Sequence, residues 1–195
     1  MNFFDRFSVD GLLAMLYSLP GILLAISFHE FAHAYSAYKL GDDTARLSGR
    51  MTISPLAHID VAGFLLLILA GFGWAKPVPV NTARLKYGRY GDLIVSLAGV
   101  VTNFILAFVV LLILLLLIAL NISLNEIVFN IFSYAIYINL ALCVFNLIPI
   151  PPLDGYRVVR ALTVGPWGSN AFLSFVERYG FIILIVLAVS DTTSS

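Results

Sequence analysis

Four long apolar stretches constrain the fold of this chain more than any other feature of its sequence. A helix needs about 20 predominantly apolar residues to cross a bilayer core of roughly 30 Å. The stretches that reach this length are residues 11–38, 93–120, 127–148 and 171–189. Hydrophobic residues make up 61% of the 195-residue chain and charged residues only 11%, too few to coat a soluble protein of this size. The sequence therefore predicts an all-α polytopic membrane protein with about four full transmembrane helices.

A fifth apolar stretch, residues 61–73, is too short to be assigned as a span on length alone. Short positively charged loops tend to stay cytoplasmic, and such loops lie on both sides of this stretch. Their basic residues are Lys39, Arg46 and Arg50 before it, and Lys76, Arg84, Lys86 and Arg89 after it. A crossing would separate two clusters that prefer the same side. The stretch is therefore predicted to enter the membrane and return, which leaves both ends of the chain outside the cell.

The segments on either side of this re-entrant stretch mix apolar and polar residues. Residues 44–57 and residues 74–82, the latter reading WAKPVPVNT, predict short membrane-associated β-strands. The prolines would place the second strand at the edge of a sheet.

Three ionisable residues with the spacing of a metal site lie within the first apolar stretch. It contains His29-Glu30-x-x-His33, and 3.6 residues per turn place both histidines on one helix face with the glutamate beside them. Two imidazoles at this spacing can bind one zinc ion while the carboxylate accepts a proton from a water. An ionisable residue inside a membrane segment costs at least about 2.5 kcal/mol. A cluster of three therefore favours a functional site over solvated residues at a helix end.

A catalytic zinc ion usually has a third protein ligand, and few residues of this chain qualify. His58, in the sequence SPLAHID, is interpreted as a hydrogen-bonding loop residue rather than a ligand. Glu126 is expected in an external loop, and Glu177 is adjacent to Arg178, its expected ion-pair partner. Asp154 remains the strongest candidate.

Asp154 occurs in the sequence NLIPIPPLDG, immediately after the third long apolar stretch. The prolines end the helix and make the backbone irregular, which is acceptable at membrane depth only where protein or water lines it. By itself, the segment fits a simple turn at the interface equally well. The re-entrant topology favours the metal site, because it places Asp154 at the same depth as His29 and His33. A crossing at residues 61–73 would put them a bilayer apart.

Taken in order, the sequences HEFAHAYSAYKLGDDTARLSGRMTISPLAHID, GWAKPVPVN and NLIPIPPLDG resemble the site-2 protease family of intramembrane metalloproteases. The resemblance is closest to the small prokaryotic subgroup that lacks an inserted regulatory domain. It implies His29, His33 and Asp154 as the ligands of one Zn²⁺ ion per chain and Glu30 as the general base. It also implies that Asn146 binds the substrate backbone or the developing oxyanion.

One motif of the family is incomplete in this chain. The sequence AGVVTN, residues 98–103, lacks the proline that commonly follows the glycine. Gly99 and Asn103 keep the i, i+4 spacing for close helix packing with one polar contact across helices. Asn103 is therefore interpreted chiefly as a packing residue, with a place next to the site as the alternative.

Residues and resemblance together predict an intramembrane zinc metalloprotease that hydrolyses peptide bonds in or near transmembrane segments of other membrane proteins. Its active site is expected toward the cytoplasmic side of the cell membrane. We expect a single domain over residues 1–195, with a catalytic core at about 9–160 and the last helix at about 171–189. Basic and acidic residues are equal in number, 11 each, which gives no indication of nucleic-acid binding.

Two other functions are compatible with ionisable residues in a membrane. A metal or ion transporter would be expected to show paired half-sequences, and this sequence shows no such repeat. An inactive membrane binding protein of the same fold would have no need of the base Glu30.

Overall fold

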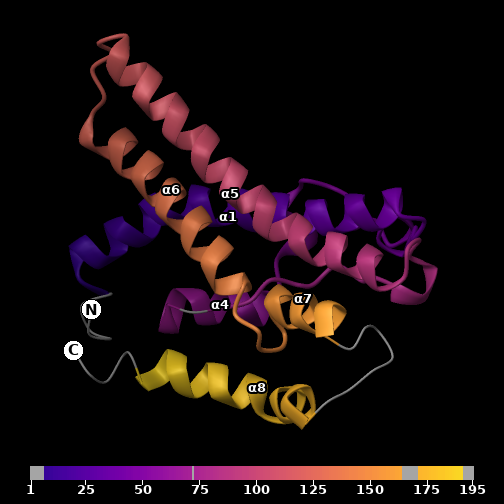
Figure 1. The fold of residues 1–195 in the computed structure, drawn as a ribbon. Coiled ribbons are helices and arrows are strands. Elements are labelled where there is room, and N and C mark those ends of the chain that lie inside the picture. The colour runs from indigo at the N-terminus through magenta and orange to yellow at the C-terminus, as the bar shows by residue number, and fades with distance from the viewer. Residues whose placement is uncertain (1–6, 72, 164–170, 191–195) are drawn as a thin grey trace.

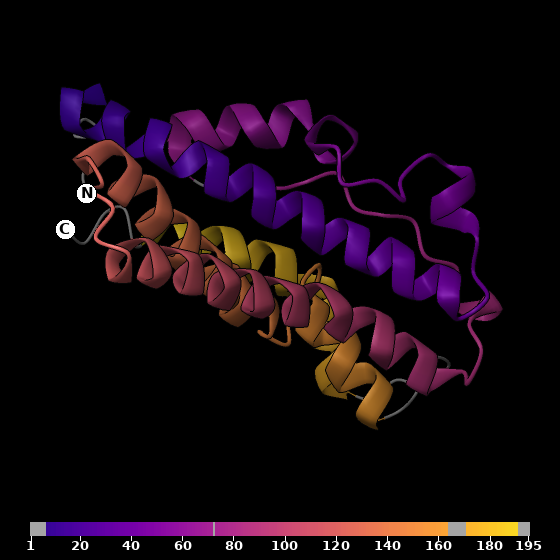
Figure 2. The same ribbon diagram turned by 90° about the horizontal axis from the view of Figure 1, so that it is seen from above.

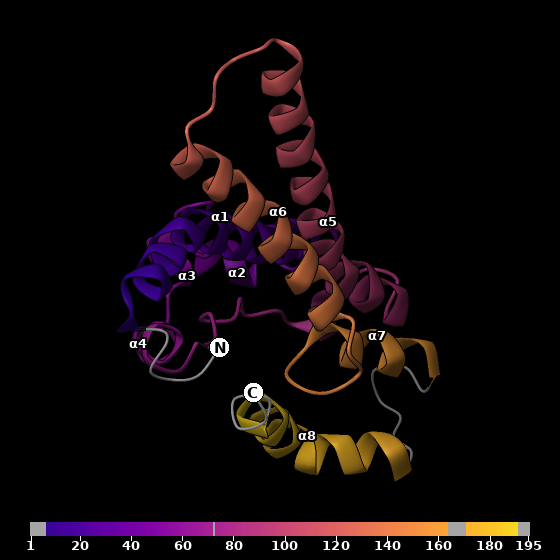
Figure 3. The ribbon, with the colours of Figure 1, turned by 90° about the vertical axis from the view of Figure 1, so that its left-hand side faces the viewer.

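Three long helices form the centre of the computed structural model, which describes residues 7–71, 73–163 and 171–190. They are α1 (Val9–Lys39), α5 (Arg89–Ala119) and α6 (Glu126–Asn146), and each contacts the other two (Figure 1). The antiparallel pair of α5 and α6 crosses α1, as Figure 3 shows from the side. All three helices are long and apolar enough to cross a membrane. The prediction of a helical membrane protein is thereby confirmed.

Short polar side chains set where two of these helices begin. The Ser8 hydroxyl accepts a hydrogen bond from Gly11 N–H at the start of α1, and Asn125 Oδ1 accepts one from Val128 N–H at the start of α6. Each bond satisfies one of the N–H groups that have no partner in the first turn of a helix. Both helices therefore begin just where the apolar runs begin.

Small residues fill the interfaces between the long helices, and large apolar residues face outward. Ala25 and Ala34 of α1 are fully buried, and a Cβ atom on Gly21 would come within 2.8 Å of the Ala135 Cα atom on α6. The large apolar side chains of α5 are instead exposed along much of the helix, including Val101, Phe104, Ile105, Phe108, Leu112, Leu115 and Leu116. Close packing at small residues with an apolar exterior is the arrangement of a helix bundle surrounded by lipid.

The fifth apolar stretch forms the short helix α4 (Val61–Ala70), which is too short to cross the membrane core. Its 10 residues extend about 15 Å, roughly half of the hydrocarbon thickness. The chain before and after it meets again, because Ile59 and Ala75 form an isolated antiparallel bridge and Lys76 N–H donates to His58 C=O at 2.8 Å. Figure 2 shows α4 beside the N-terminal half of α1. The chain before α4 therefore lies next to the chain after it, and the entry of this segment into the membrane and its return stay a prediction.

The two predicted β-strands are wrong, since the described part of the chain contains no strand. Residues 44–57 instead include the one-turn helices α2 (Thr44–Leu47) and α3 (Pro55–His58). Residues 74–82, which we call the strap, are extended along the C-terminal half of α1 and lead into the short helix η2 (Thr82–Arg84) (Figure 2).

The strap does not pair with a β-strand among the described residues, because several of its backbone N–H groups are absent or bond to other partners. Pro77 and Pro79 have no N–H group to offer to a neighbouring strand. The N–H groups of Val78 and Asn81 donate to acidic side chains instead of to backbone carbonyls. The mixture of apolar and polar residues was therefore a poor guide here, because Val78 and Asn81 bond to side chains rather than to a second strand.

After α6, the chain forms α7 (Asp154–Thr163) and α8 (Ala171–Ser190). Tyr156 of α7 packs against Leu173 of α8, and the Tyr156 hydroxyl hydrogen bonds to Glu177. Glu177 was expected to pair with the adjacent Arg178. In the structure, it forms a hydrogen bond to a tyrosine on another helix. Among the described residues, α1, α5 and α6 are the helices that meet the length and hydropathy of a span. A fourth crossing by α8 stays a prediction.

Residues before and after α4 should be accessible from the same side of the membrane. With Cys143 replaced by serine, the exposed positions Ser48 and Ala83 can each be changed to cysteine, as can Ser123 between α5 and α6. We expect Ser48→Cys and Ala83→Cys to react with a membrane-impermeant maleimide from one side, and Ser123→Cys from the other. Reaction of the first two from opposite sides would show that α4 crosses.

Candidate metal centre

Helix α1 brings two histidines together inside the bundle. His29 and His33 are one turn apart, both are buried, and their Nε2 atoms lie 3.0 Å apart. The rings meet nearly edge-on, with centroids 4.6 Å apart and an interplanar angle of 83°. Their i, i+4 spacing places both imidazoles on the face of α1 that packs against Gly99 of α5.

Asp154 reaches these histidines from a distant part of the chain. After α6 ends, the chain turns through residues 147–153 into α7, whose first residue is Asp154. Asp154 Oδ2 lies 3.2 Å from His29 Nε2 and 3.2 Å from His33 Nε2. Gly155 permits the tight turn, because a Cβ atom there would lie 2.2 Å from the Leu147 carbonyl oxygen. The structure therefore brings together the three side chains that the sequence indicates as ligands.

The three side chains have the spacing and chemistry that a zinc ion requires. Bonds of 2.0–2.1 Å at tetrahedral angles set neighbouring ligand atoms about 3.3 Å apart, and the observed separations are 3.0, 3.2 and 3.2 Å. Burial alone would raise the pKa of the Asp154 carboxyl, but His29 and His33 hold that pKa well below its usual range. Two imidazoles and an ionised carboxylate form a donor set that suits zinc.

Helix α5 contacts both imidazoles, through the Val95 carbonyl oxygen and Gly99. The Val95 carbonyl oxygen lies 2.7 Å from His33 Nδ1, so Nδ1–H donates to it and Nε2 keeps its lone pair for a metal ion. One turn later, a Cβ atom on Gly99 would lie 2.5 Å from His29 Cε1 and 2.6 Å from His33 Nε2. Only glycine at position 99 lets α5 approach the imidazoles this closely.

Glu30 lies next to the histidines and is held by the strap. Its Oε2 accepts a hydrogen bond of 2.9 Å from Val78 N–H. Glu30 and His29 line the same cavity. The position of Glu30 beside the histidines follows from the sequence, but its backbone donor, 48 residues away, does not.

Two further contacts fix the ends of the strap. At its start, the buried Arg50 side chain donates to Lys76 C=O at 2.5 Å, and His58 C=O accepts from Lys76 N–H at 2.8 Å. Near its end, the buried Asp42 carboxylate accepts from Asn81 N–H at 2.7 Å. The sequence analysis missed the roles of Arg50 and Asp42. The only feature of the sequence that could have indicated these roles is that both residues are charged and follow the histidine motif.

His58 is fully buried and lies outside the cluster of candidate ligands. Its Nε2–H donates to Thr52 C=O at 2.7 Å, and an Arg50 nitrogen lies 3.5 Å from its Nδ1. His58 is thus a hydrogen-bonding loop residue, as interpreted from the sequence. It stabilises the loop that contains Arg50 and Thr52, and this loop bonds to Lys76 of the strap.

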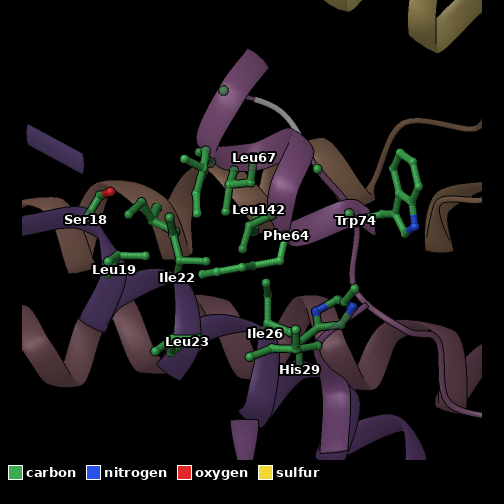
Figure 4. A pocket seen from close by; sticks show the side chains of 18 of the residues that line it. Ser18, Leu19, Ile22, Leu23, Ile26, His29, Phe64, Leu67, Trp74 and Leu142 are labelled. Carbon is green, nitrogen blue, oxygen red and sulfur yellow. The ribbon is translucent and has the colours of Figure 1, made fainter. Parts of the chain in front are cut away.

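A cavity of about 1070 Å³ opens beside the metal centre. Residues of α1, α4 and α6 form most of its wall, which is largely apolar. Figure 4 shows Ile22, Ile26, Phe64 and Leu142 around this space, with His29 at its edge. The cavity connects the histidine motif to a long apolar surface within the bundle.

Two asparagines line the same cavity. Asn146 is the last residue of α6, and its Nδ2 donates to Leu142 C=O at 3.0 Å. Asn103 lies on α5, one turn beyond Gly99, and is fully buried. Both residues therefore line the cavity together with His29 and Glu30.

Comparison with known proteins identifies the family. The model of peptidase family M50 matches residues 117–187, which include Asn146 and Asp154. YwhC of Bacillus subtilis, a candidate zinc metalloprotease, is 43% identical over 194 residues, which cover 97% of this chain and 88% of YwhC. The chain belongs to peptidase family M50. This is the site-2 protease family that the three motifs resemble, and the protein is accordingly an intramembrane zinc metalloprotease with zinc as its cofactor.

More distant relatives have related names. Rip2 of Mycobacterium tuberculosis (strain H37Rv), also a candidate zinc metalloprotease, is 29% identical over 89% of this chain and 67% of its own length. Zinc metalloprotease MJ0392 of Methanocaldococcus jannaschii is 27% identical over 85% of this chain and 40% of its own length. No solved structure matches the chain significantly. These findings do not favour the transporter or the inactive binding protein.

Replacing Gly99 by alanine should weaken zinc binding without unfolding the protein. Alanine normally favours a helix over glycine by about 1 kcal/mol, but here its methyl group would collide with both imidazoles. Overpacking of this kind costs about 1–3 kcal/mol, which corresponds to a loss of zinc affinity of roughly tenfold to a hundredfold. Titration with a competing chelator measures this affinity. Val101→Ala, on the exposed face of the same helix, is the control, and unchanged affinity in Gly99→Ala would contradict the prediction.

Replacing Arg50 by alanine should release the strap while leaving the metal centre intact. Loss of a hydrogen bond to a charged group should speed amide exchange of Lys76 and Val78 by about 10- to 100-fold. Hydrogen exchange followed by mass spectrometry measures this change, and metal analysis should show normal zinc content. Arg46→Ala removes an exposed arginine of α2 and should leave exchange in the strap unchanged. Unaltered exchange in Arg50→Ala would show that Arg50 does not hold the strap.

Proposed function

We propose that this protein cleaves transmembrane segments of other membrane proteins at a zinc ion held by His29, His33 and Asp154. The observation that carries the proposal is the meeting of three ligand atoms within 4.8 Å of one another, beside the cavity that His29 and Glu30 line. Three protein ligands leave one position of a tetrahedral zinc site open for water or substrate. Membership of peptidase family M50 supports the same assignment.

Glu30 is the general base in this proposal. When bound, a zinc ion supplies a Lewis acid that polarises the scissile carbonyl and lowers the pKa of the attacking water. The Glu30 carboxylate accepts a proton from this water and passes it to the departing amide nitrogen. The strap orients the carboxylate, because Val78 N–H occupies Oε2 and leaves Oε1 for the water.

Asn146 binds the substrate backbone or the oxyanion that develops on it. Asn146 lines the cavity and ends α6 directly before the turn that carries Asp154. One hydrogen of its amide donates to Leu142 C=O, which orients the group. The second N–H of the same NH₂ group remains available to a substrate carbonyl.

The strap suits a substrate that has been locally unwound. Peptide bonds within a helix are shielded by their own hydrogen bonds, so a transmembrane segment must become extended before it is cleaved. The N–H and C=O groups of Lys76 both form hydrogen bonds within the protein, to His58 and Arg50. In an extended chain, the N–H and C=O groups of the next residue point to the opposite side of the chain. Pro77, which lines the cavity, and Pro79 therefore offer carbonyls to an added chain but no donors.

The charge pattern supports an active site on the cytoplasmic side. Basic residues flank α4 on both sides, whereas residues 120–125 between α5 and α6 contain no lysine or arginine. Lys86 N–H donates to Leu40 C=O at 2.8 Å, which joins the end of α1 to the start of α5 at the basic end of the bundle.

The Glu30→Gln variant tests the proposed base. Glutamine keeps an oxygen for the Val78 N–H, so the variant should retain zinc while cleavage of a membrane substrate in liposomes falls by about 10²- to 10⁴-fold. Metal analysis and gel-based cleavage assays measure the two properties. His33→Ala should instead lose zinc, and a chelator should abolish wild-type cleavage until zinc is restored. Equal cleavage by wild type and Glu30→Gln would exclude this base.

A further inference from the structure

Besides Asp154 Oδ2, which faces the two histidines, two buried polar groups at the metal centre have no hydrogen-bond partner among the described residues. One is His29 Nδ1, and the other is the side-chain amide of Asn103, in which both Oδ1 and Nδ2 are unpaired. Asn103 is fully buried, and His29 and Asn103 line the same cavity. Buried polar groups without partners are rare, because each costs roughly 1–3 kcal/mol.

The two histidines differ in how their second ring nitrogen is supported. A histidine that binds a metal through Nε2 carries a proton on Nδ1, and this N–H almost always donates to a carbonyl, a carboxylate or a water. His33 meets this requirement through Val95 C=O at 2.7 Å. His29 meets it with no group of the described chain. The described chain therefore supplies an acceptor for His33 Nδ1–H but none for His29 Nδ1–H.

Helix α5 places Asn103 where such an acceptor is needed. Val95, Gly99 and Asn103 are spaced four residues apart on one face of α5, opposite the histidines of α1. An ideal Cβ atom on Gly99 would lie 2.7 Å from His29 Nδ1. Residues four apart on a helix have Cβ atoms about 5–6 Å from one another. No direct hydrogen bond joins the Asn103 amide to Nδ1, and this spacing along α5 is compatible with a bridge through one water.

We propose that Asn103 is a positioning residue that fixes His29 by accepting, through one water in the cavity, the hydrogen bond of His29 Nδ1–H. The inference rests on the proposed role of His29 as a zinc ligand. A buried water is stable where it has two to four polar partners, and His29 Nδ1 and Asn103 Oδ1 supply two. Asn103 then does for His29 what the Val95 carbonyl does for His33.

Asn139 shows how an asparagine that serves only in helix packing differs. Asn139 of α6 is equally buried and its Oδ1 also has no partner among the described residues, but its Nδ2 donates to Ala135 C=O at 2.8 Å within its own helix. It is not among the residues that line the cavity. A packing role for Asn103 would require a comparable bond, and both atoms of its amide are unpaired. Asn139 is therefore the matched control.

The test compares zinc affinity in full-length Asn103→Leu, Asn103→Asp and Asn139→Leu, purified in detergent and titrated against a competing chelator. Asn103→Leu removes the acceptor at similar volume and should weaken zinc binding by about 10- to 100-fold. Asn103→Asp keeps an acceptor oxygen and should stay within about threefold of wild type, as carboxylate–histidine–zinc arrangements do. Asn139→Leu should also bind zinc normally. Thermal unfolding checks that each variant is folded, and Asn103→Ala replaces the leucine variant if that variant does not fold.

Each contrary result identifies a different error. Wild-type zinc affinity in Asn103→Leu, together with a raised KM, would overturn the proposal and assign Asn103 to substrate binding. Equal losses in Asn103→Asp and Asn103→Leu would exclude the acceptor role, and an equal loss in Asn139→Leu would point to packing alone. The variant His29→Ala separates this inference from the proposed function. If His29→Ala keeps wild-type zinc affinity, the proposed metal site itself is wrong.

Discussion

Two imidazoles and a carboxylate lie buried among apolar helices, where a polar group without a partner costs roughly 1–3 kcal/mol. This requirement fixes how three separate helices meet. The Val95 carbonyl can reach His33 only if α5 approaches α1 closely, and Gly99 makes that approach possible. The turn after α6 must then bring Asp154 to the depth of the histidines, where it lies 3.2 Å from both. The metal centre and the helix packing are consequences of the same contacts.

The same requirement explains the strap. The Glu30 carboxylate is partly buried, and Val78 N–H provides its partner. Asp42 and Arg50 are also buried charged side chains, and each takes its partner from the backbone of the strap. An extended segment of nine residues is thus held by charged side chains at its start, middle and end. Its position is set by the burial of charge, since it gains no support from a sheet.

The sequence could predict those parts of the site that depend on local periodicity. The spacing of His29 and His33 follows from one helical turn, and the short length of residues 61–73 indicated a segment too short to cross, which is the helix α4. The structure of the strap could not be predicted in this way, because a mixture of apolar and polar residues is the same whether the backbone pairs with a strand or with side chains. The partners of Val78 and Asn81 lie 48 and 39 residues away. Likewise, the need for Gly99 becomes visible only when the imidazoles opposite it are in place.

The strap connects substrate binding to the base in the proposed mechanism. It follows directly on α4, whose residues form part of the cavity wall, and the bridge between Ile59 and Ala75 fixes that junction. A substrate chain that bonds to the Pro77 carbonyl is one residue from Val78, whose N–H orients Glu30. An intact helix cannot make this contact, because its own backbone donors are already bonded. Unwinding of the substrate is therefore needed both to expose the scissile bond and to engage the segment that holds the base. In the proposed mechanism, an apolar helix that reaches the cavity without unwinding is therefore not cleaved.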